Sequence, residues 1–314
     1  LYCPTDLSLL SQKERAKDVL EALLGEKFNG NTEAFKKLSP ISYIDRTDPP
    51  VLTFHGTEDP IVPFQQAKLL HAKLKEAGVP NRLVPIEGAG HGFRGRWQEV
   101  YRKIWNFFGN YLIPTDMPLV AADDFDKGAG NWEPTDKSAW KIEKRNGDAF
   151  YALFKRRSSY KPPFRSPYNI SLLKDVEVTD FVMDIDLRST ITPYGHQDLC
   201  VFFGYQDPAH FYYVHIGRRA DSHANSIFIV NKAPRVSIAK KRTKGTNWSK
   251  GWHWARVIRD TKKGTIQVFF DDMENPIMST VDKTFLWGRV GVGSFDDTGE
   301  FDAFRLWGKR KGPK

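Results

Sequence analysis

The spacing of hydrophobic residues changes near residue 115, and this change constrains the fold more than any other feature of the 314-residue sequence. Before it, segments with apolar residues at helical spacing alternate with short apolar runs. After it, runs of four to ten strand-forming residues are separated by turn sequences such as QDPA and DTKKG, and no long helical segment remains. We therefore expect two domains of different architecture, residues 1–114 and residues 115–314.

The first domain is predicted to be of the α/β class with a parallel sheet. The apolar runs PPVLTFHG (49–56) and RLVPIE (82–87) are typical of buried strands, and residues 63–78 between them have the spacing of an amphipathic helix. Two further helices are predicted at 11–25 and 96–112. Strands that alternate with helices in this way form parallel sheets.

The second domain is predicted to be an all-β sandwich or jelly roll, because many short strands at regular spacing are typical of that architecture. Hydrophobic residues make up 40% of the chain and aromatic residues 13%, which is enough for a large core. No run of about eighteen apolar residues occurs, so the sequence predicts no membrane span.

The formal net charge of +9 is unevenly distributed. Residues 1–114 hold 15 Lys and Arg against 13 Asp and Glu, whereas the remaining residues hold 32 against 25. Apart from the terminal GKRKGPK, positive and negative residues are interspersed along the sequence. A nucleic-acid reader concentrates its positive charge on one element, so we expect a solvated basic surface and no nucleic-acid partner.

Two candidate catalytic residues follow the two predicted strands. Asp59 comes just after the first strand, and His91 lies between glycines just after the second. The carboxyl ends of parallel strands meet at one edge of a sheet, so an acid and a base would lie close together there. We interpret them as the acid and the general base of a proton relay. Glu58 is the weaker choice for the acid, and His55 is interpreted as structural.

The sequence HGTEDPIVP, followed about thirty residues later by GAGHGF, resembles the C-terminal part of α/β-hydrolase fold esterases. YCPTDL near the start also resembles the segment that follows the nucleophile in that fold. Among these enzymes it is most similar to acetyl-xylan and feruloyl esterase-like and dienelactone-hydrolase-like proteins. The resemblance implies that Asp59 is the triad acid and His91 the base, with no cofactor for hydrolysis. It also implies a polysaccharide or another ester as the substrate.

The sequence departs from this family at the nucleophile. No Gly-x-Ser-x-Gly motif and no HGGG-type loop for an oxyanion hole occurs in the chain. Since both belong upstream in this fold and the chain starts at Leu1, we expect a fragment whose serine lies on preceding residues. On this interpretation the fragment is inactive alone.

The second domain resembles laminin-G-like and concanavalin-like jelly rolls, on its opening DDFDKGAGNW and its closing GEFDAFRLWG. Many such domains bind a structural Ca²⁺ where these strands meet, so the resemblance implies Asp124, Asp126 and Asp302 as ligands. Ordinary turn aspartates explain these residues equally well.

Aromatic and polar residues on the middle strands suggest a sugar-binding face. Period two places Phe211, Tyr213 and His215 on one face of their strand. Candidate ligand-binding residues are Asp198, Tyr213, His215, Arg218 and Trp252, although a sandwich also needs large residues for its core.

These observations favour a serine esterase, exported to the periplasm or beyond, with an appended glycan-binding sandwich. Two alternatives remain open. The sandwich could be a carbohydrate-binding module beside a non-catalytic hydrolase remnant, or it could itself cleave glycans through a pair of carboxylates.

Overall fold

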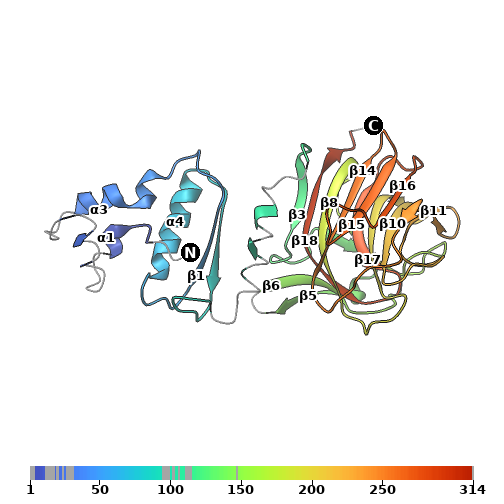
Figure 1. The fold of residues 1–314 in the computed structure, drawn as a ribbon, viewed down its shortest axis with the longest axis horizontal. Coiled ribbons are helices and arrows are strands. Elements are labelled where there is room, and N and C mark those ends of the chain that lie inside the picture. The colour runs from blue at the N-terminus through green and yellow to red at the C-terminus, as the bar shows by residue number, and fades with distance from the viewer. Residues whose placement is uncertain are drawn as a thin grey trace. The chain divides into compact units, whose positions relative to one another are not determined.

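The computed structural model (Figure 1) describes residues 4–10, 32–93, 115–145 and 148–312, together with a few positions between 18 and 25 and between 100 and 109. The chain divides into two compact units, residues 1–111 and residues 112–314. Each unit has its own hydrophobic core.

The first unit contains a strand, a helix and a second strand that form a parallel pair. They are β1 (Val51–Gly56), α4 (Phe64–Glu76) and β2 (Asn81–Ile86). The two strands are parallel, with Val51 opposite Asn81 and Gly56 opposite Ile86. The predictions for residues 49–56, 63–78 and 82–87 are thereby confirmed. The remaining elements are α1 (Leu7–Leu10), α3 (Thr32–Leu38) and the 3₁₀ helix η1 (Pro40–Tyr43).

Most residues of the two helices predicted at 11–25 and 96–112 lie outside the described residues.

Buried apolar side chains from both strands and from the segments after them form the core of this unit: Phe54, Val84, Ile86, Phe93 and Val100.

Helix α4 has two features that its sequence explains. It is followed by Gly78, whose φ of +77° is accessible to glycine without strain and stops the helix, and the Gly78 N–H donates to the Lys75 carbonyl. Its polar Gln66 is fully buried, which amphipathic spacing does not predict. The reason is a set of hydrogen bonds: the Gln66 side chain accepts from the backbone of Thr5 and Asp6 and donates to the Asp6 carbonyl.

The second unit is a β-sandwich, in which the predicted series of short strands is confirmed. One sheet has seven strands in the order β12-β11-β10-β9-β17-β7-β4. The other has nine, in the order β13-β16-β15-β14-β8-β18-β6-β5, with β3 pairing with β18 off this path. All neighbouring strands in both sheets are antiparallel.

The strands of the seven-stranded sheet are β4 (Trp132–Pro134), β7 (Asn169–Leu173), β9 (Asp198–Asp207), β10 (His210–Gly217), β11 (Ser226–Asn231), β12 (Val236–Ser237) and β17 (Arg289–Ser294). The strands of the nine-stranded sheet are β3 (Leu119–Asp123), β5 (Trp140–Arg145), β6 (Asp148–Leu153), β8 (Val178–Ser189), β13 (Lys241–Arg242), β14 (His253–Asp260), β15 (Thr265–Phe270), β16 (Met278–Val281) and β18 (Gly299–Arg310). A short 3₁₀ helix, η2 (Lys137–Ala139), precedes β5.

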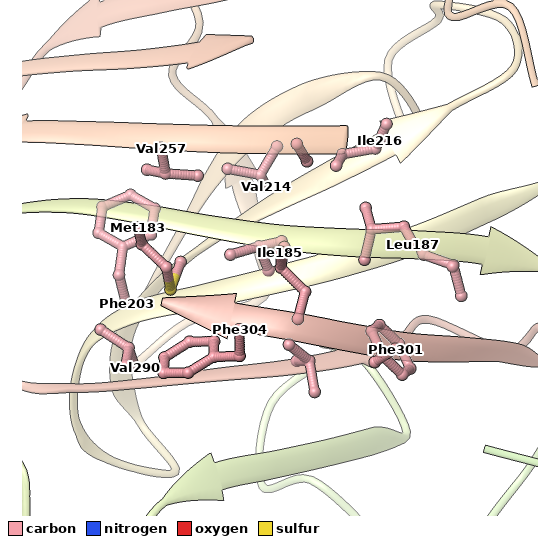
Figure 2. Close-up of a cluster of buried hydrophobic side chains, with 14 of the residues drawn as sticks. Met183, Ile185, Leu187, Phe203, Val214, Ile216, Val257, Val290, Phe301 and Phe304 are labelled. Carbon is pink, nitrogen blue, oxygen red and sulfur yellow. The ribbon is translucent and has the colours of Figure 1, made fainter. Parts of the chain in front are cut away.

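The main core lies between the two sheets and is built by alternation along the strands. Figure 2 shows Met183, Ile185 and Leu187 of β8 meeting residues of the opposite sheet such as Phe203 and Val214. Every second side chain of a strand points to the same face, so the longer strands such as β9, β10 and β15 each contribute three residues to this core. Burial of this apolar surface is the main source of stability for the sandwich.

The other face of the seven-stranded sheet is also buried. Phe211 and Tyr213 of β10 and Phe202 of β9 form a second apolar cluster there, and Tyr160 and Phe164 of the segment 154–168 pack against it. The cluster also contains Cys200, which is fully buried and has a free thiol, and burial raises the pKa of that thiol well above its usual value.

Among the helices that the structure describes, none is long and apolar enough to cross a membrane.

Removing two methyl groups from the core should destabilise the sandwich far more than the same change at its surface. Val257 on β14 is 1% exposed and Val281 on β16 is 49% exposed. We expect Val257→Ala to lower the free energy of unfolding by about 2–3 kcal/mol, from lost transfer energy and the cavity left behind. Val281→Ala should cost less than about 1 kcal/mol. Denaturant titration followed by tryptophan fluorescence measures both, and equal effects would contradict the assigned core.

Candidate functional site

The loop after β1 holds the Asp59 carboxylate in a fixed position. Asp59 is buried, and its Oδ1 accepts hydrogen bonds from the backbone N–H groups of Ile61 and Val62, at 2.8 and 3.0 Å. The loop thus bends back on its own aspartate, an arrangement that Asp favours. The neighbouring Glu58 is exposed, which favours Asp59 as the candidate acid.

The loop after β2 packs closely against the end of β1. The Glu58 N–H donates to the Ala89 carbonyl at 3.0 Å, and the Gly88 N–H donates to the Thr57 hydroxyl oxygen at 2.9 Å. At Gly56 the approach is so close that a Cβ atom would lie 2.2 Å from the Ala89 carbonyl oxygen. Only glycine fits there, and its absence of a side chain lets the two loops meet.

The structure brings the two predicted catalytic residues together. The His91 Nδ1 lies 2.9 Å from the Asp59 Oδ2, and the His91 side chain is 32% exposed while that of Asp59 is buried. Because an ionised carboxylate only accepts, the proton of this hydrogen bond belongs to His91 Nδ1. In the neutral ring Nε2 then carries the lone pair, which is the tautomer that a general base needs.

Asp59 is held ionised by its hydrogen bonds. Burial, the largest single influence, would raise the pKa of its carboxyl group, but the hydrogen bonds from His91, Val62 and Ile61 together hold that pKa below its usual value. A permanent negative charge beside His91 stabilises the imidazolium that forms when the ring accepts a proton.

His55 has a structural environment, in line with its interpretation from the sequence. It is 1% exposed, and its Nε2 donates to the Val62 carbonyl at 2.8 Å, with the Asp59 Oδ2 at 3.5 Å. On the solvent side, residues Glu87–Phe93 line a hollow of about 480 Å³ that includes His91. A small acyl group fits a hollow of this size.

The prediction that Tyr213, Asp198 and His215 bind a sugar is wrong, because the structure buries all three side chains. Tyr213 and Asp198 are 0% exposed and His215 is 4% exposed. The predicted alternation is correct, but the segment 154–168 covers this face and the Arg235 guanidinium donates to the Tyr213 hydroxyl at 2.7 Å. A sugar cannot reach these side chains in this conformation.

The other two predicted ligand-binding residues lie apart from that face. Arg218 is exposed, and its guanidinium donates to the Trp248 carbonyl and the Gln197 side chain. Trp252 is half-buried and packs against the ring of Phe150 and under the guanidinium of Arg188. No single site unites the five residues.

Two of the three predicted calcium ligands, Asp302 and Asp124, act with their charges on a buried cation of the chain itself, Arg305. Burial lowers the pKa of the Arg305 guanidinium, and the charges of Asp302 and Asp124, with those of Asp186 and Asp184, oppose that effect. Asp302 is fully buried and Asp126 is half-buried. A calcium ion would compete with this guanidinium for the same carboxylates, and its binding stays a prediction.

Three carboxylates that the structure brings together were not predicted as a group. Asp198, Asp296 and Asp297 place one oxygen each within 4.8 Å of one another. Asp297 accepts from the Asp198 N–H at 3.0 Å and from the Tyr194 hydroxyl at 2.9 Å. The only signal in the sequence is the pair of aspartates after β17, since their contact with the start of β9 depends on tertiary structure.

Two of these aspartates titrate near neutral pH. Burial raises the pKa of Asp297 to about 7, with the charge of Asp198 adding to the effect, and burial raises the pKa of Asp198 to about 6. Both groups therefore bind protons more tightly in the folded state than in the unfolded chain. The stability that they contribute is complete below about pH 4 and is lost as the pH rises through 6 and 7.

The variant Asp297→Asn should reduce this pH dependence. Between pH 5 and pH 8 we expect the free energy of unfolding of the wild-type chain to fall on the order of 2 kcal/mol further than that of the variant. Denaturant titration at several pH values measures the difference. Asp116→Asn, at an exposed position, is the control and should leave the slope unchanged. A wild-type slope in Asp297→Asn would contradict the assignment.

The contact between Asp59 and His91 should depend on the glycine at position 56. Gly56→Ala would place a methyl group against the Ala89 carbonyl, so the loop that carries His91 must move. We expect loss of the low-field proton resonance of the His91 Nδ1–H and a destabilisation of about 1–3 kcal/mol. Gly90→Ala is the matched control, because its nearest new neighbour would be 3.9 Å away. An unchanged resonance in Gly56→Ala would refute the close packing of the two loops.

Comparison with known proteins finds esterases for the first unit. The BD-FAE family model matches residues 1–74. Esterase LipC of Mycobacterium tuberculosis is 33% identical over 97 residues, which are 30% of this chain and 24% of LipC. Esterase LipQ of the same organism is 33% identical over 72 residues, 23% of this chain and 17% of LipQ. The chain thus spans a quarter or less of the length of these curated relatives.

Among solved structures, the carbohydrate-binding module CBM66 from Bacillus subtilis aligns with 56% of this chain and 95% of its own, at a TM-score of 0.41 and 13% identity. The chain is similar to esterases in its N-terminal region, and the sheets of its own structure form the β-sandwich that follows.

Proposed function

We propose that the chain provides the acid and the base of a serine-type carboxylic-ester hydrolase, joined to a β-sandwich that holds the enzyme on a polysaccharide. The observation that carries the first part is the 2.9 Å contact between His91 Nδ1 and the buried, ionised Asp59. Two strand-end loops present this acid and base in the chain order of the α/β-hydrolase fold. The similarity to LipC over 97 residues of the chain supports the same reaction class.

In the proposed reaction His91 acts as general base and then as general acid. Its Nε2 accepts the proton of a serine hydroxyl as that oxygen attacks the ester carbonyl, and it returns the proton to the leaving alcohol. Asp59 keeps the ring in the required tautomer and stabilises the imidazolium. A water molecule then releases the acyl group by the same proton transfers in the second half of the reaction.

The serine itself is proposed to lie outside these 314 residues. The sequence contains no Gly-x-Ser-x-Gly motif, and the esterases that it matches are several times longer than the matched region. The alternative is a binding module whose hydrolase part has no catalytic role. The presence or absence of a nucleophile on the remaining part of the protein distinguishes the two.

A polysaccharide ester is the proposed substrate class. Trp254 on β14 is 38% exposed, and the Arg256 guanidinium lies 4.9 Å from its ring while binding Asp184 with two hydrogen bonds. An exposed aromatic ring fixed in this way can cover the apolar face of a sugar. Because such substrates are met outside the cell, the proposal implies export of the protein.

The proposal is tested with the chain extended by any coding sequence that precedes Leu1, assayed on a p-nitrophenyl acetate and on an acetylated xylan. If a nucleophile is present, His91→Ala and Asp59→Asn should lower kcat by about 10³–10⁴-fold. Glu58→Gln, at the adjacent exposed carboxylate, should change kcat less than about threefold. Covalent labelling by a fluorophosphonate reports the serine directly. Equal losses in Asp59→Asn and Glu58→Gln, or activity that survives His91→Ala, would overturn the assignment.

A further inference from the structure

Two long stretches of the sandwich sequence contain basic residues and no acidic ones. Residues 149–174 hold six Lys and Arg without any Asp or Glu, and residues 222–259 hold nine without any Asp or Glu. The two stretches are separated by almost fifty residues that do contain both signs of charge. Because these intervening residues mix both signs, the charges look interspersed when the sequence is read as a whole.

The fold brings the two stretches into contact on one side of the sandwich. The Arg235 N–H donates to the Arg165 carbonyl at 3.0 Å, which joins the segment before β12 to the segment 154–168. Tyr160 and Phe164 of the latter pack on the outer face of the seven-stranded sheet. The Arg235 guanidinium stacks on Phe228, at 4.8 Å from its ring centre, on the same face.

From this junction the second stretch continues along the edge of the sandwich. Strand β12 is the edge strand of the seven-stranded sheet, and β13 is the edge strand of the nine-stranded sheet. Residues between the two strands therefore pass from one sheet to the other, with Lys240 on that passage and Lys241 as the first residue of β13. We call the following exposed residues the basic surface: Arg157, Lys161, Arg165, Lys232, Lys240 and Lys241.

The charges of the basic surface are not neutralised within the described chain. None of its six residues has a carboxylate oxygen within 4.0 Å among the residues that the structure describes. Elsewhere in the sandwich, cations such as Arg289 are paired, in that case with Glu133 at 2.6 Å. Gathered like charges without counterions raise the local potential and attract polyanions.

We propose that the basic surface binds an anionic polysaccharide, one that carries sulfate or carboxylate groups along its length. This inference rests on the proposed glycan-holding role of the sandwich and names the class of glycan. Lys and Arg form charge-assisted hydrogen bonds with sulfate and carboxylate oxygens. The cations are spread over loops and an edge of the sandwich, whereas a nucleic-acid reader places a helix or a ribbon in a groove or offers exposed rings for base stacking.

The test compares two charge-reversed forms of the full chain. In the first, Lys161→Glu, Arg165→Glu and Lys232→Glu are combined on the basic surface. In the matched control, Lys127→Glu, Lys262→Glu and Lys283→Glu change three exposed lysines elsewhere on the sandwich, with the same change in net charge. Circular dichroism and thermal unfolding confirm that each form is folded before binding is measured.

Binding is measured by isothermal titration at 50 mM NaCl with dextran sulfate, with unsulfated dextran of the same length, and with a DNA duplex. We expect the dissociation constant for dextran sulfate to rise at least tenfold in the first form and less than threefold in the control. Unsulfated dextran should bind much more weakly, and salt should weaken the binding of dextran sulfate. Equal losses in both forms would show only an effect of net charge and overturn the proposal, as would tighter binding of the duplex.

The outcome is independent of the catalytic proposal, since each titration can be repeated with Asp59→Asn. Loss of ester hydrolysis with retained binding of dextran sulfate leaves this inference standing. Failure of the charge test with retained hydrolysis removes it and leaves the acid–base assignment untouched.

Discussion

Burial of both faces of the seven-stranded sheet is the constraint on which the sandwich unit depends. Strand β10 sends Tyr212 and Val214 into the core between the sheets, and it sends Phe211 and Tyr213 under the segment 154–168. Each face gains apolar burial, and the sheet becomes an interior layer rather than an exposed platform. Ligands are then left with the loops, the edges and the covering segment, where the basic surface lies.

In the first unit, two strands and the loops that follow them are enough to position Asp59 and His91. Two parallel strands end side by side, and the glycine at the end of β1 allows the next loop to approach within contact distance. A buried carboxylate fixed by two backbone N–H groups then orients one imidazole ring. The orientation of this pair comes from the backbone hydrogen bonds to Asp59 and from the close approach of the two loops at Gly56.

Much of this arrangement could be predicted from the sequence, and the failures have physical causes. Strands and the α4 helix follow from the spacing of apolar residues, and Asp59 and His91 follow from their places after neighbouring strands. Spacing also gave the correct face for Tyr213 and His215. It contains no information on what covers that face, because the covering segment is irregular and lies fifty residues away.

Contacts between loops were the part that the sequence could not supply. Asp198 meets Asp297 only because β9 and β17 are neighbours in the sheet, and Arg165 meets Arg235 only because both of their segments cross the same face. A count of charges along the sequence therefore does not reveal the basic surface, whose residues come together only in the folded chain. The assignment of Asp124, Asp126 and Asp302 to a calcium ion came from a family resemblance and stays a prediction.

The thiol of Cys200 gives the sandwich a built-in reporter. It lies on β9 in the outer apolar cluster, beneath the segment 154–168, and burial keeps it protonated. Alkylating reagents attack a thiolate that they can reach, so they would modify Cys200 only when the covering segment or the sheet itself has opened. Once Cys3 is replaced by serine, the rate of modification would time that opening in solution, without any added label.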